Sequence, residues 1–114
     1  MKPFVIDKPA ILERLGGDEE IFAMMLDLYL QDVENNCLAL KTAFDTGNTA
    51  MLQREAHTIK GLLATVSDDD GAARAMLLEQ MGKQGNLEGA AALIGEVQLR
   101  LREVGGALAA ELAG

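Results

Sequence analysis

The only histidine of this chain, His57, lies in the run EAHTIKG, residues 55–61. An imidazole offers a nucleophilic ring nitrogen, and covalent catalysis at histidine requires open access and compensation of incoming negative charge. Lys60 lies one helical turn away and could balance that charge. Gly61 costs a helix about 1 kcal/mol relative to alanine, and its missing side chain would give another protein's surface clearance at the ring. The segment could therefore carry a negatively charged group on His57.

The apolar pattern around this segment predicts a helix that turns His57 toward solvent. Apolar residues recur at spacings of four and three, which marks one helical face: Leu52, Ala56, Ile59, Leu63 and Val66. At about 100° per residue these five fall within about 80° of arc, and His57 points roughly 140° away from their centre. The residues expected beside His57 on the polar side are Gln53, Lys60, Gly61 and Ala64, with Arg54 a little further round.

The run AHTIKG, residues 56–61, resembles the phosphorylation motif A-H-x-h-K-G of histidine phosphotransfer (HPt) domains, in which h is apolar. Residues 12–20 resemble that family's entry into its first long helix, the Leu78-Glu79 pair falls on the helix after the histidine, and residues 85–88 resemble its last turn. The likeness runs from about residue 11 to residue 112. It departs at Ser67, where the family commonly has glycine, and at Gly71, where it tends to have a larger apolar residue.

The resemblance implies a phosphoryl carrier rather than an enzyme with its own nucleotide site. His57 would accept a phosphoryl group from the aspartyl phosphate of a receiver domain, as in a hybrid sensor histidine kinase, and pass it to another response regulator. The receiver would bring the Mg²⁺, so we expect no intrinsic cofactor. Glu79 would either hydrogen-bond the ring nitrogen that is not phosphorylated or pair with Lys83, four residues further on. Residues expected to contact the partner are Gln53, Arg54, Gly61 and Ala64, with an apolar addition from Ile21, Met24 and Leu28.

Composition restricts the remaining function classes. A length of 114 residues predicts one domain, residues 1–114. The net charge of −8 argues against nucleic acid and against anionic membranes. Neither a membrane-spanning apolar run nor a signal peptide is apparent, and the single cysteine, Cys37, suits a reducing cytosol. No glycine-rich phosphate loop and no His/Cys cluster for zinc is present. We expect a cytoplasmic monomer without a metal.

Periodicity and turn residues predict an all-α fold. A short helix at about residues 9–15 precedes four long helices at about 18–44, 49–66, 68–83 and 87–112. Asp18 and Ser67 are the expected N-caps of the first and third long helices, and Gly82 and Gly85 should weaken the end of the third. Short turns favour antiparallel neighbours, hence an up-down-up-down four-helix bundle over about residues 18–112 with a short additional N-terminal helix.

Two other interpretations are compatible with the sequence. A helical adaptor could bind a receiver or kinase without being phosphorylated, and it would not need His57. A small acidic enzyme is a third possibility, although no second reactive group converges on His57 in the sequence. Labelling by a phosphorylated receiver separates the carrier from the adaptor, and a main pocket far from His57 would favour the enzyme.

Overall fold

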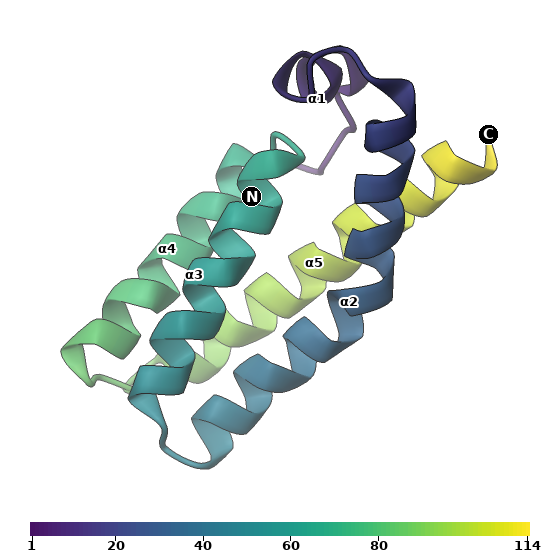
Figure 1. Ribbon diagram of the computed structural model, residues 1–114. Coiled ribbons are helices and arrows are strands. Elements are labelled where there is room, and N and C mark those ends of the chain that lie inside the picture. Colours follow the sequence, from purple (N-terminus) through teal and green to yellow (C-terminus); the bar gives the residue numbers. More distant parts are fainter.

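A computed structural model describes all 114 residues, which form five helices and no strand (Figure 1). Their bounds are α1 Lys8–Arg14, α2 Glu19–Asp45, α3 Thr49–Thr65, α4 Asp69–Gln84 and α5 Ala90–Ala113. The four long helices alternate in direction, each packs against two others, and α1 lies at one end of the bundle. The predicted fold class, an all-α antiparallel bundle with a short N-terminal helix, is confirmed.

Side-chain caps explain where two of the long helices begin. The Asp18 carboxylate accepts hydrogen bonds from the backbone N–H groups of Glu20 and Ile21, so the predicted N-cap of α2 is confirmed. Asn48 caps α3 in the same way by accepting from the N–H of Met51. At the other end of α4, Gly85 has a φ of 68°, a left-handed conformation that stops a helix at low cost when the residue is glycine.

The predicted N-cap of α4 is wrong by one residue. Ser67 has a φ of 60°, and Asp68 takes the cap position, with its carboxylate accepting from the N–H of Gly71 at 3.1 Å. An ionised carboxylate is a stronger acceptor than a hydroxyl at the positive end of a helix, and this one has a second partner described below. The last helix begins at Ala90, later than predicted, because Gly89 ends the preceding turn with a φ of 78°.

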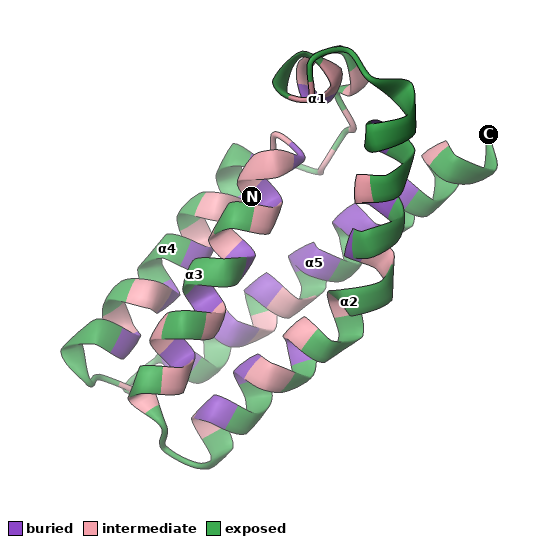
Figure 2. Cartoon of the chain, viewed as in Figure 1, coloured by how far each residue is buried: buried purple, intermediate pink, exposed green.

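The core lies between the four long helices, and Figure 2 shows their buried positions facing inward. The predicted apolar face of the histidine helix is confirmed in full, since each of its five residues is at most 1% exposed. Truncating one such buried leucine or isoleucine to alanine typically costs about 2–5 kcal/mol. With this face held in the core, the opposite face of α3 has to lie at the surface.

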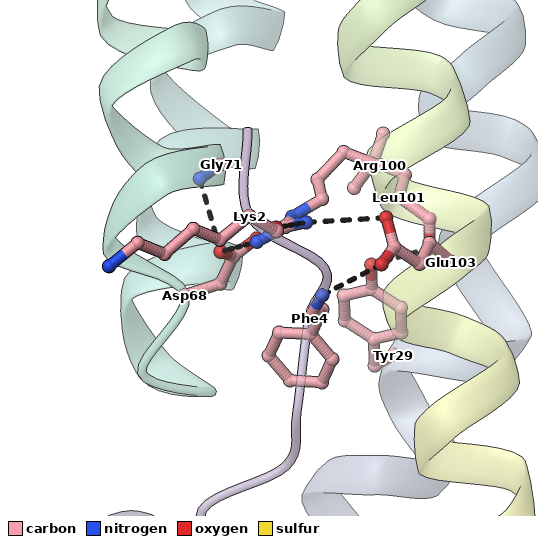
Figure 3. Close-up of polar contacts among 8 residues, drawn as sticks. All are labelled: Lys2, Phe4, Tyr29, Asp68, Gly71, Arg100, Leu101 and Glu103. Carbon is pink, nitrogen blue, oxygen red and sulfur yellow. Dashed lines mark hydrogen bonds and ion pairs between the residues drawn. The ribbon is translucent and has the colours of Figure 1, made fainter.

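A buried ion pair joins α5 to the start of α4 (Figure 3). Arg100 is 4% exposed and Asp68 is 2% exposed. The Arg100 guanidinium donates from Nε to Asp68 Oδ2 at 2.9 Å and from Nη2 to Asp68 Oδ1 at 2.7 Å, a bidentate arrangement. Its Nη1 also donates to the carbonyl of Lys2 at 2.6 Å, which ties the N-terminal segment to the bundle.

The ion pair accounts for the glycine at position 71. A Cβ atom on Gly71 would lie 2.1 Å from Asp68 Oδ2 and 3.1 Å from Cγ of Arg100. The larger apolar residue that the resemblance suggests at this position therefore has no room here. The Asp68 carboxylate and the aliphatic part of the Arg100 side chain fill the space that a side chain at residue 71 would otherwise occupy.

A single buried hydroxyl joins α2 to α5. The Oη of Tyr29 donates a hydrogen bond to the carbonyl oxygen of Leu101 at 2.8 Å, and the side chain is almost completely buried (Figure 3). Burial raises the pKa of the Tyr29 phenol well above its ordinary value, and nearby Cys37 acts in the same direction. The phenol therefore stays a neutral donor, and the hydrogen bond persists across the working pH range.

Candidate functional site

His57 lies on the solvent face of α3, as the apolar pattern predicts. Its side chain is 67% exposed, although the residues on either side of it in the core pattern, Ala56 and Ile59, are fully buried. The ring Nδ1 lies 2.8 Å from Oε2 of Glu79 on the neighbouring helix α4. The other ring nitrogen, Nε2, has no partner within the protein. The imidazole is thus held at one nitrogen and open at the other.

Glu79 bridges the histidine to the lysine of the motif. Its second carboxylate oxygen, Oε1, accepts a hydrogen bond from Nζ of Lys60 at 2.6 Å. These contacts, first with Lys60 and then with His57, hold the pKa of the Glu79 carboxyl below its usual range. Because the carboxylate is an acceptor only, the Nδ1 of His57 must be the protonated nitrogen of a neutral ring. The lone pair then resides on Nε2, the exposed nitrogen.

The Glu79 bridge should contribute to folding stability in a pH-dependent way. A carboxyl whose pKa is lower in the folded state stabilises the fold above its unfolded pKa of about 4.3, and that contribution disappears as the pH falls through the folded value. The difference in unfolding free energy between the wild type and Glu79→Gln should therefore shrink as the pH falls below about 4. Urea denaturation of both proteins across this range measures it. A difference that does not change with pH would contradict the bridge.

An open hollow surrounds the imidazole on one side. It is lined by Ala50, Gln53, Arg54, His57, Thr58 and Glu79. The structure thus brings the predicted residues Gln53 and Arg54 together with His57. Arg54 forms no ion pair, so its charge is available to an incoming anion, whereas the charge of Lys60 is already compensated by Glu79. The sequence reasoning missed Ala50 and Thr58, although Ala50 precedes His57 by seven residues, a spacing that returns to the same helical face.

The two small residues of the prediction lie along α3 beyond the ring. A Cβ atom on Gly61 would meet nothing within 4 Å, so the surface next to the imidazole is open there. Ala64 is half-buried and lies outside the hollow. On α2, Ile21, Met24 and Leu28 are 45%, 62% and 56% exposed. They form the apolar surface that we call the α2 patch, and Leu28 also lines a mainly apolar cleft between α2 and α3.

Neither a metal centre nor a membrane-spanning helix is present in the structure. The protein contains no group of three or more His, Cys, Asp or Glu side chains arranged to hold a metal ion. None of the five helices combines the length and the apolar character needed to cross a membrane.

Comparisons with known proteins identify a family and a similar fold. The family model described as Hpt domain matches residues 24–109, a range that contains all three members of the His57–Glu79–Lys60 cluster. The fold is similar to the crystal structure of histidine-containing phosphotransfer protein B (HptB) from Pseudomonas aeruginosa PAO1. The TM-score is 0.85 over 95% of this chain and 94% of that one, and at 23% identity the likeness shows a common fold. No curated protein sequence matches the chain.

Proposed function

We propose, from the premise that this chain belongs to the Hpt domain family, that His57 is the residue on which it carries a phosphoryl group. Hpt domains are phosphoryl carriers that exchange the group with receiver domains in phosphorelays, and this chain is such a carrier rather than an enzyme with a nucleotide site. The observation that supports His57 is its held and exposed ring: Nδ1 bonds to Glu79 at 2.8 Å while Nε2 is free.

The proposed transfer uses the lone pair of Nε2. This nitrogen attacks the phosphorus of an aspartyl phosphate on the receiver, a P–N bond forms, the P–O bond to the aspartate breaks, and the carboxylate leaves with the bonding electrons. Nδ1 keeps its proton and its hydrogen bond to Glu79 throughout, so positive charge that develops on the ring faces a carboxylate. The reverse reaction with a second receiver returns the neutral imidazole. Mg²⁺ is expected on the receiver.

We propose that Lys60 and Arg54 share the compensation of negative charge at the ring, Lys60 indirectly and Arg54 directly. Lys60 stabilises the ionised form of Glu79, at 2.6 Å, and so acts on the ring through that carboxylate. Arg54 lines the hollow beside the ring and has no ion-pair partner, which makes it the cation best placed for an incoming phosphoryl group. Gln53 joins it at the polar rim, and Gly61, Ala64 and the α2 patch would meet the apolar part of the receiver surface.

The partners that fit are the receiver of a hybrid sensor histidine kinase, as donor, and that of a response regulator, as acceptor. We further propose a monomer that works in the cytoplasm without a cofactor of its own. Incubation with a phosphorylated receiver and Mg²⁺ tests the function. The protein should acquire a label that is lost in acid but stable in base, and should pass it to a second receiver. Binding of the receiver without any label would favour the adaptor instead.

Gly61 tests whether clearance at the ring matters. Gly61→Ala should preserve transfer and stabilise α3 by up to about 1 kcal/mol, because the added Cβ meets nothing. Gly61→Leu places bulk where the receiver approaches, and transfer should slow on the order of tenfold or more. Quench-flow measurement of labelling gives both rates. Gly95→Leu is the matched control, since Gly95 is also helical with open space at its Cβ but lies on α5. Equal rates for Gly61→Leu and the wild type would remove the clearance argument.

A further inference from the structure

The backbones of the histidine helix α3 and its neighbour α4 approach each other closely at Gly82. A Cβ atom on Gly82 of α4 would lie 2.6 Å from the backbone nitrogen of Gln53, 2.9 Å from its Cα and 2.9 Å from the carbonyl oxygen of Thr49. All three are backbone atoms of α3, so no side-chain rotation can make room. Gly82 is buried, and α4 continues past it to Gln84. Gly82 therefore lies inside α4, although glycine has a low helix propensity.

This close approach is one helical turn from the functional cluster. His57 follows Gln53 by four residues on α3, and Glu79 precedes Gly82 by three residues on the antiparallel helix α4. The two backbones that touch at Gly82 and Gln53 are thus the two that present Glu79 and His57 to each other. The distance between α3 and α4 at Gly82 and Gln53 therefore determines their distance at Glu79 and His57.

We infer that Gly82 is a positioning residue: its missing side chain lets α4 approach α3 closely enough for Glu79 to hold the ring of His57. This inference rests on the proposed function, in which Nδ1 of His57 is held by Glu79 and Nε2 accepts the phosphoryl group. Nonbonded carbon atoms prefer about 3.5–4.0 Å, so a methyl group at residue 82 would push the helices apart by roughly 1 Å. Hydrogen bonds of 2.8 and 2.6 Å do not survive an added 1 Å without rearrangement.

The state of the His57 ring measures this effect directly. His57 is the only histidine, so its ring nitrogens give unique ¹⁵N resonances in the unphosphorylated protein. In the wild type the neutral ring should carry its proton on Nδ1. Gly82→Ala should shift the ring toward the Nε2–H form and slow transfer from a phosphorylated receiver on the order of tenfold. Gly95→Ala, the matched control at an open helical position, should change neither quantity.

A double-mutant cycle separates positioning from a general loss of structure. Glu79→Ala removes the ring's partner, and adding Gly82→Ala to it should then leave the tautomer ratio unchanged. If Gly82→Ala alters the ring equally with and without Glu79, the inference is wrong. Glu79→Asp is a second test that leaves the packing at Gly82 intact. It shortens the side chain by one methylene, and the tautomer ratio of His57 should change in the same direction as in Gly82→Ala.

These variants also decide the matter if Gly82→Ala does not fold. In that case Glu79→Asp alone is the test, and an unchanged tautomer ratio and transfer rate would show that the close approach is not required. The readout does not depend on phosphorylation, since tautomers are measured on the unmodified protein. A wild type that is never labelled would therefore overturn the proposed function, whereas a wild type with the proton on Nε2 would overturn the role of Gly82.

Discussion

His57→Gln is expected to abolish phosphoryl labelling by a phosphorylated receiver completely. Glutamine keeps a polar side chain of similar reach, but its amide nitrogen has no lone pair able to attack phosphorus. Because the side chain of His57 is 67% exposed, the substitution should change the unfolding free energy by only about 0.5 kcal/mol or less. Circular dichroism should show an unchanged helical spectrum, so the loss of label cannot be attributed to unfolding.

The absence of any other histidine makes this result unambiguous. Label that persisted in His57→Gln would have to reside on another type of side chain, and the assignment of His57 would end there. Glu88→Gln is a suitable control, since it introduces the same amide at an exposed residue in the turn before α5 and should be labelled as the wild type is. A receiver that still binds His57→Gln would show in addition that docking and transfer are separable.

Arg100→Met is expected to cause the largest loss of stability of any single charge removal in this protein. The Asp68 carboxylate is 2% exposed and takes two of its hydrogen bonds from Arg100. Removing one partner of a buried ion pair leaves an uncompensated charge in the interior, which typically costs about 3–5 kcal/mol. Urea denaturation followed by circular dichroism at neutral pH measures the change. A loss below about 1 kcal/mol would contradict this account of the pair.

Two further variants identify the cause of that loss. Asp68→Asn combined with Arg100→Met removes both charges while asparagine keeps the cap on α4, so the double variant should recover much of the stability. Arg102→Met is the matched control, because Arg102 lies on the same helix and pairs with Glu34 at the surface. Solvent screens an exposed pair of this kind, and its loss should be small beside that of Arg100.

The apolar pattern was sufficient to predict the fold and the solvent-facing position of His57, because both follow from the spacing of apolar residues within each helix. Five core residues on α3 fix one face, and the opposite face is then exposed in any bundle of this type. The Glu79 contact was expected only through a family resemblance. It spans 22 residues and depends on how deeply α4 packs against α3, which no single helix encodes.

The residues that determine how closely α4 packs against α3 form no recognisable pattern in the sequence. In the sequence, Gly82 is only a residue of low helix propensity. The structure shows that the backbone of α3 leaves no room for a side chain at this position. The N-cap of α4 was assigned to Ser67 instead of Asp68 for a related reason. Asp68 caps the helix while paired with Arg100, which lies 32 residues away in the sequence. An ion pair between two distant helices produces no periodic pattern in the sequence, so it could not be predicted.

The buried hydroxyl that links α2 to α5 has a practical consequence. Tyr29 is the only tyrosine and the chain has no tryptophan, so a single side chain supplies essentially all near-ultraviolet emission. Its hydrogen bond to Leu101 breaks when the two helices separate. The intrinsic fluorescence of the unlabelled protein is therefore a reporter of one helix–helix contact, and stopped-flow refolding experiments can time the docking of α5 without an added dye.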